Sequence, residues 1–155
     1  MRNGRRWQPN QVRGLAQLHD LNRYPVSFVI KGNHEDPNGN AVPCERMTQR
    51  SKRKDLRALR YKAWKLYVLQ CFTEQTRQGF PCDADGGYRL DVKCFFVGEG
   101  HGDPENVRKG IQDALFAYGD KHVTGAVEME HVKSFPRVEI KIDRLPLQDE
   151  GRDDA

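Results

Sequence analysis

Two stretches near the ends of the chain alternate hydrophobic and polar residues with a period of two. The hydrophobic positions are Val26, Phe28 and Ile30 in the first stretch, and Val138, Ile140 and Ile142 in the second. Because successive side chains of a β-strand point to opposite faces of a sheet, this pattern predicts strands with one buried face. The hydrophobic run 90–97 and the segment 126–133 predict two further strands.

Between the first two strands, the segment 55–78 contains no Gly or Pro and is rich in helix-forming residues. Its hydrophobic positions predict a wide buried stripe that consists of Leu59, Ala63, Leu66 and Tyr67, with Trp64, Val68 and Phe72 beside them. We expect Trp64 and Tyr67 to pack in the core rather than to stack on nucleic-acid bases.

A second helix is predicted over 104–118. Asp103 stands at the N-cap position, Pro104 is a favoured first helical residue, and Gly119 is a suitable stop. The apolar face of this helix consists of Val107, Ile111, Ala114, Leu115 and Tyr118.

The order strand, helix, strand, helix, strand, strand predicts an α+β fold: a single domain with a mixed four-stranded sheet and two helices. A length of 155 residues suits one domain with a real core. We expect the domain to span 24–146, between a basic, mobile arm at 1–23 and an acidic tail at 147–155.

The distribution of charge is more informative than the net value of +4. Basic residues are concentrated in the first half of the chain, and in the segment 46–65 the only acid is Asp55. Such a block predicts a polyanionic partner, and nucleic acid is the first candidate. The expected DNA contacts are Arg46, Arg50, Lys52 and Arg53, together with His101 and Arg108.

The four cysteines, Cys44, Cys71, Cys82 and Cys94, lack the spacing of paired zinc ligands. We expect reduced thiols, with a structural zinc at the last three as the alternative. No hydrophobic run approaches the ~20 residues that span a bilayer, and no signal peptide is evident. These features predict a cytoplasmic protein with no membrane partner.

Charged side chains crowd the start of the second helix. Glu105, Lys109 and Asp113 recur at four-residue spacing and share one helix face beside Asp103. Two acids next to a lysine can hold a divalent cation and one more positive charge, which is what phosphodiester chemistry requires. The structural alternative is that Asp103 only caps the helix and the other three form a solvated ladder worth ~0.2–0.5 kcal/mol per pair.

The sequence DPENVRKGIQD at 103–113, with Asp120 beyond it, resembles the RusA family of Holliday junction resolvases. The segment GNAVPCERMT at 39–48 is similar to the Pro-and-Arg segment that follows the first strand of that family. The resemblance covers roughly 24–143. The chain departs from the family at Glu105, where Asp is usual, and at Asp120, where the family often has two adjacent Asp residues.

The resemblance implies a metal-dependent endonuclease. Asp103, Glu105 and Asp120 would bind Mg²⁺, for which Mn²⁺ could substitute, and Asp113 is a further candidate ligand. Lys109 would neutralise charge on the scissile phosphate. The implied substrate is a four-way junction, the branched DNA of recombination and repair, and the implied active form is a homodimer. Interface residues suggested by the sequence are Val127, Met129 and Val138.

Two other functions remain open. Glu139-Ile140-Lys141 is an acid-x-Lys tripeptide in a predicted strand, which faintly resembles the PD-(D/E)xK nucleases with Asp120 upstream. The other alternative is a non-catalytic, basic DNA-binding module whose acids are structural.

Overall fold

A computed structural model describes residues 23–45, 56–81, 87–117 and 122–146. The elements, in chain order, are β1 (Val26–Lys31), α2 (Leu56–Thr76), β2 (Tyr88–Val97), α3 (Pro104–Leu115), β3 (Val123–Thr124), β4 (Val127–Val132) and β5 (Arg137–Arg144). The predicted α+β fold with a mixed sheet is confirmed. The predicted count of four strands is wrong, because β3 adds a fifth strand of two residues, too short to show any periodicity.

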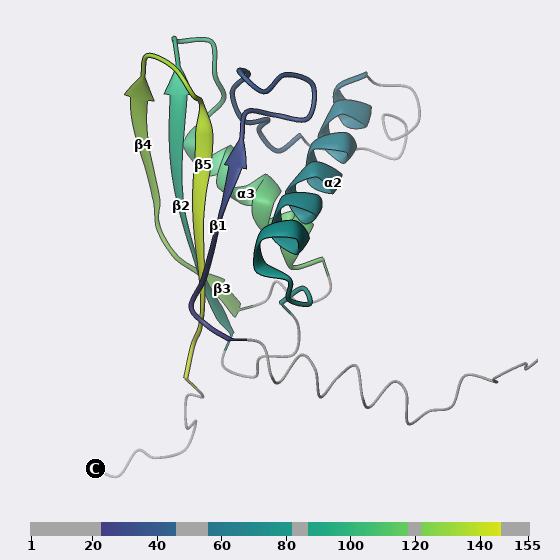
Figure 1. The fold of residues 1–155 in the computed structure, drawn as a ribbon, viewed down its shortest axis with the longest axis vertical. Helices are drawn as coiled ribbons and strands as arrows, with labels where there is room; N and C mark the ends of the chain where they lie inside the picture. Colours follow the sequence, from purple (N-terminus) through teal and green to yellow (C-terminus); the bar gives the residue numbers. More distant parts are fainter. Residues whose placement is uncertain (1–22, 46–55, 82–86, 118–121, 147–155) are drawn as a thin grey trace, which may run out of the picture.

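The five strands form one sheet, and both helices lie on the same side of it (Figure 1). Strand β2 is central: it pairs antiparallel with β5 and parallel with β3 and β4, and β5 pairs antiparallel with β1. The sheet turns residues such as Phe28, Phe96 and Ile140 toward the helices, where they are buried. The opposite face has no described helix over it (Figure 1). The core is therefore a single layer between sheet and helices.

Helix α2 buries only part of the predicted stripe: Trp64, Val68 and Phe72 are buried as predicted, but the buried face is rotated away from the rest. Its buried residues are Ala58, Tyr61, Trp64, Val68, Cys71 and Phe72. Trp64 is fully buried, as predicted, but Leu59 and Leu66 of the predicted stripe are 46% and 68% exposed. Hydrophobic residues occur on several sides of this helix, so their pattern does not fix its rotation. Packing against β1 and α3 does.

Helix α3 begins as predicted. The side chain of Asp103 accepts a hydrogen bond from the backbone N–H of Glu105, and a proline occupies the first turn. The predicted apolar positions that the structure describes are all buried: Val107, Ile111, Ala114 and Leu115. The helix ends at its cap residue Phe116, earlier than predicted, and Tyr118 and Gly119 lie outside the described residues.

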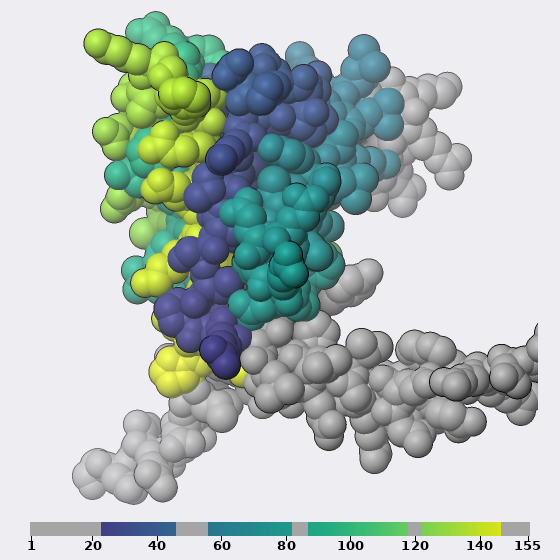
Figure 2. Space-filling model, in the orientation of Figure 1, coloured from purple at the N-terminus to yellow at the C-terminus, as the bar shows by residue number. Residues whose placement is uncertain are grey.

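One edge of the sheet is closed by a side chain of α2. The Gln75 amide accepts the N–H of Val29 in β1 at 2.9 Å and donates to the Val29 carbonyl at 2.6 Å. These two bonds replace those of a neighbouring strand. Figure 2 shows α2 packed directly against β1. Among the described strands, the edge that no other strand or helix closes is that of β4, whose four central residues are exposed.

The thiols of Cys44, Cys71 and Cys94 are free, and Cys82 lies outside the described residues. Burial raises the pKa of Cys71 and raises that of Cys94 to about 12. Both thiols therefore stay protonated and unreactive at neutral pH. Across the four described ranges, no helix has the length and apolar character needed to cross a membrane.

Candidate functional site

The first turn of α3 presents two carboxylates and a lysine to solvent. Asp103 and Glu105 are exposed, and Lys109, one turn further along, is exposed as well. One Asp103 oxygen, Oδ1, accepts the Glu105 N–H at 3.0 Å. The capping role of Asp103 is therefore real, but capping occupies only one of its carboxylate oxygens. Among the described ion pairs, none joins Lys109 to Glu105 or Asp113, so the ladder expected as a structural alternative is not formed.

The segment that leads into the basic block is attached to this helix turn. The backbone N–H of Cys44 donates to the carbonyl of Asn106 at 2.9 Å. Beside it, a Cβ added to Gly102 would lie 2.8 Å from the Pro43 side chain, so this close approach requires a glycine. Cys44 therefore lies beside the first turn of α3, and Glu45, the last described residue before the basic block, follows it directly.

The predicted DNA contacts fall into two groups. Arg46, Arg50, Lys52 and Arg53 lie outside the described residues, directly after Glu45 in the chain. Of the described pair, His101 lies in the loop before α3. Arg108 is already used inside the protein: its guanidinium donates to the Leu90 carbonyl and to Gln112 Oε1, both at 3.2 Å. Arg108 therefore braces α3 against the sheet, and its predicted DNA contact is not supported.

Asp113, the fourth acid of the motif, has a structural partner. Its Oδ2 accepts a hydrogen bond from the Tyr61 hydroxyl at 2.9 Å and lies 3.6 Å from Cys44 Sγ. Burial, with the hydrogen bonds to Cys44 and Asp113, raises the pKa of Tyr61 well above its ordinary value. A Cβ on Gly110 would meet the Tyr61 ring at 3.1 Å, so α2 and α3 pack closely at this glycine. Asp113 therefore joins the two helices, and its predicted role as a metal ligand is not supported.

We expect Asp113→Ala to destabilise the fold by about 1–3 kcal/mol, because it leaves the buried Tyr61 hydroxyl without its acceptor. Asp113→Asn keeps an acceptor oxygen and should cost much less. Urea unfolding of both variants measures the difference. In a double-mutant cycle with Tyr61→Phe, the two changes should be strongly non-additive. Additive effects would mean that Asp113 does not act through Tyr61.

Asp120, the third predicted metal ligand, lies outside the described residues. The described residues that precede and follow its segment lie at the C-terminal end of α3. There the Phe116 ring packs 5.2 Å from that of Tyr88, and Val123 pairs with Tyr88. Asp103 stands at the other end of a helix of 12 residues, about 18 Å long at 1.5 Å per residue. Among the residues that the structure describes, no group of three His, Cys, Asp or Glu side chains could hold a metal ion.

A hollow of about 630 Å³ adjoins the turn that presents Asp103 and Glu105, since Gly102 lines it. It is bounded by the loops after β1 and β2 and by Arg60 of α2, and its acids are Glu35, Asp36 and Glu99. Glu35 is paired with Arg60, whose hydrogen bond lowers the pKa of Glu35. The hollow and the first turn of α3 thus lie at the same end of the sheet.

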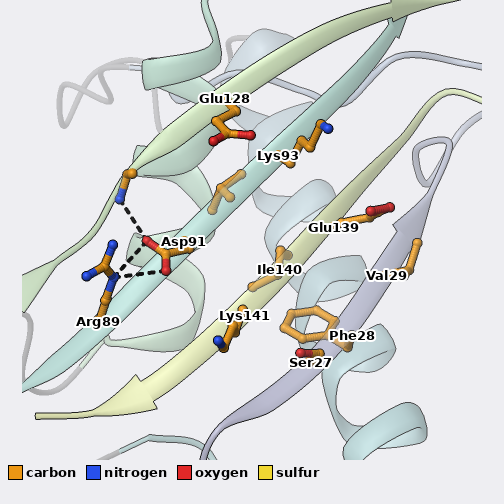
Figure 3. Close-up of a pocket in the computed structure, with 12 residues that line it drawn as sticks. Ser27, Phe28, Val29, Arg89, Asp91, Lys93, Glu128, Glu139, Ile140 and Lys141 are labelled. Atoms are coloured by element: carbon orange, nitrogen blue, oxygen red, sulfur yellow. Dashed lines mark hydrogen bonds and ion pairs between the residues drawn. The ribbon is translucent and has the colours of Figure 1, made fainter.

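A second hollow, of about 470 Å³, lies on the uncovered face of the sheet (Figure 3). Its lining includes Glu139 and Lys141 of the acid-x-Lys tripeptide. Asp91 on β2 is in register with Lys141 on β5. Its carboxylate accepts hydrogen bonds from the Arg89 side chain and from the Ala126 N–H. Partial burial raises the pKa of Asp91, but these two hydrogen bonds outweigh it and the pKa falls below its ordinary value. Glu139 is paired with Arg137 at 3.7 Å. Asp91 and Glu139 are therefore already paired with bases, whereas Glu128, which also lines this hollow, makes none of the described ion pairs.

Comparison with known proteins does not extend the sequence evidence. No protein-family model matches this chain, and no curated protein matches it. The RusA resemblance therefore rests on the spacing of residues 103–113 and on the segment 39–48.

Proposed function

We propose that this protein is a metal-dependent endonuclease that cuts branched DNA, and specifically a Holliday junction resolvase of the RusA type. The observation that carries the proposal is the hydrogen bond from Cys44 to Asn106. It attaches Cys44, which the chain follows with Glu45 and then the basic segment 46–65, to the turn that presents Asp103, Glu105 and Lys109. This attachment supports a nuclease, in which basic residues bind the phosphates of the same DNA that the carboxylate–lysine site would cut.

The side chains suit Mg²⁺ or Mn²⁺. Both described carboxylates are exposed hard oxygen donors, and Mg²⁺ commonly uses only one or two carboxylates while it keeps several waters and binds substrate phosphate. Asp103 and Glu105 would hold the ion. Asp120, expected as a third ligand, is left out of this site, because the described residues on either side of its segment lie at the other end of α3, about 18 Å from Asp103. When bound, the ion would supply Lewis-acid stabilisation and an activated water. Lys109 would donate hydrogen bonds to a non-bridging phosphate oxygen and offset the negative charge that develops there.

The test is incubation with a labelled four-way junction beside a linear duplex of the same sequence. We expect paired nicks in the junction with Mg²⁺, less or no cutting of the duplex, and no cutting in EDTA. Binding without cutting under all metal conditions would instead identify the non-catalytic DNA-binding module. Equal cutting of both substrates would remove the junction preference but not the nuclease activity.

We further propose that the active form is a homodimer. Two symmetric nicks need two copies of the site formed by Asp103, Glu105 and Lys109, related by a two-fold axis. Of the residues suggested for the interface, Val138 is wrong, since it is fully buried in the core, whereas Met129 is 41% exposed on the open edge strand β4. Light scattering at micromolar concentration should give about twice the 17.9 kDa chain mass. A monomeric mass both with and without junction DNA would contradict the dimer.

The PD-(D/E)xK alternative is favoured by one observation: Glu139 and Lys141 share the uncovered sheet face with Asp91 of the neighbouring strand (Figure 3). It is weakened by the ion pairs that these acids already make. Glu139→Gln tests it directly, because it should abolish cutting only if this face is the active site. We place the activity in the cytoplasm, where thiols stay reduced.

A further inference from the structure

Two histidines from distant parts of the chain meet beside α3. His101 lies in the loop after β2, and His131 lies on β4, in parallel register with Phe96. Their Nε2 atoms are 2.9 Å apart. The His101 ring stacks on the Phe96 ring with centroids 3.9 Å apart and planes 2° apart. The Nε2 atom of each imidazole therefore faces the Nε2 atom of the other.

A contact with the backbone fixes the tautomer of His101. Its Nδ1 lies 2.8 Å from the Gly102 carbonyl, which can only accept, so Nδ1 carries the proton. In the neutral ring Nε2 then offers a lone pair toward His131. A histidine whose second nitrogen donates to a backbone carbonyl is in the arrangement found for metal ligands, because that bond fixes tautomer and ring orientation. Stacking on Phe96 removes the remaining freedom of the ring.

We propose that His101 and His131 form a binding site for a divalent transition-metal ion of the Zn²⁺ or Ni²⁺ class. Two imidazole nitrogens on one tetrahedral ion, each ~2.05 Å from it, lie roughly 3.3 Å apart. The pair thus needs to open by a few tenths of an ångström. His131 is exposed on the open edge strand, where such a shift meets little resistance. Water or a substrate oxygen would complete the coordination.

This site is distinct in chemistry from the proposed Mg²⁺ site. Imidazole nitrogens select the transition metals, whereas Asp103 and Glu105 offer the hard oxygens that suit Mg²⁺. The two sites are neighbours, since Gly102 separates His101 from Asp103. An ion on the histidine pair would join the loop before α3 to β4. The inference does not depend on the nuclease proposal, because metal binding is measured without DNA.

The test is calorimetric titration of untagged protein with Zn²⁺ and, separately, with Ni²⁺. We expect one ion per chain, and a loss of more than about 10-fold in affinity for His131→Gln and for His101→Gln. His122→Gln is the matched control, because His122 is also exposed and should bind normally after substitution. Unchanged affinity in His131→Gln would overturn the proposal. Loss of binding in Cys44→Ser would overturn it as well, because it would identify the Cys44 thiol as a ligand in place of the histidine pair.

A second measurement keeps the test independent of any variant. In long-range ¹H–¹⁵N spectra of the wild-type protein, Zn²⁺ should shift the Nε2 resonances of both histidines. The Nδ1 resonance of His101, which already carries the proton, should stay nearly in place, whereas that of His131 should move, because Nδ1 takes up the proton that Nε2 releases to bind the ion. Shifts in neither ring, or in one ring only, would show that the pair is a simple hydrogen bond and not a metal site.

Discussion

Asp103→Asn should reduce cutting of a four-way junction by at least about 10²-fold and leave junction binding intact. In the proposed active site the carboxylate charge holds the metal ion, and stabilisation by a metal ion or a directed charge in the transition state is worth several kcal/mol. Asparagine caps helices about as well as aspartate, so α3 should keep its first turn. In the proposed complex, binding would depend on many Lys and Arg contacts to phosphate, and loss of one acid would reduce repulsion. Single-turnover cutting and fluorescence anisotropy measure the two properties separately.

Two controls separate metal binding from helix capping. Asp103→Ser also keeps the cap and should lose cutting to the same degree, while both variants should unfold near the wild-type urea midpoint. Glu99→Gln removes an exposed acid from the neighbouring loop and should cut normally. Full cutting by Asp103→Asn would show that Asp103 is only a cap, and the proposed active site would then be wrong.

Helix α3 was predictable because local signals decide it. Asp103 and a following proline define its start, and hydrophobic residues fall on one face only, so burial of Val107 and Ile111 follows from the sequence. Helix α2 lacks such a bias. Leu59 and Leu66 are as hydrophobic as the residues that are buried, and only contacts with β1 and α3 decide which face turns inward.

Features formed across long sequence distances could not be predicted. Tyr61 and Asp113 are separated by 52 residues, and nothing in the spacing of 103–113 shows that Asp113 turns toward α2. The histidine pair depends on the parallel register that places His131 beside Phe96. Sequence spacing thus identified the exposed part of the motif, Asp103, Glu105 and Lys109, but not which acid the fold had already used.

Lys109→Ala should also lower the cutting rate by about 10²-fold and leave the dissociation constant for junction DNA nearly unchanged. A short-range charge on the transition state contributes a few kcal/mol, whereas one phosphate contact among many contributes little to affinity. Lys109 is exposed, and no described carboxylate forms an ion pair with it, so its removal leaves no buried group unpaired. The variant should therefore unfold like the wild type.

Lys109→Arg distinguishes catalysis from positioning. Arginine retains the positive charge but has a planar, longer side chain with fixed donor directions, so it should restore phosphate binding more fully than it restores the cutting rate. Lys133→Ala, which removes another exposed lysine from the loop after β4, is the matched control and should cut normally. If Lys109→Ala lost affinity and cutting rate by the same factor, and Lys109→Arg regained both, Lys109 would be a substrate contact with no separate role in the chemical step.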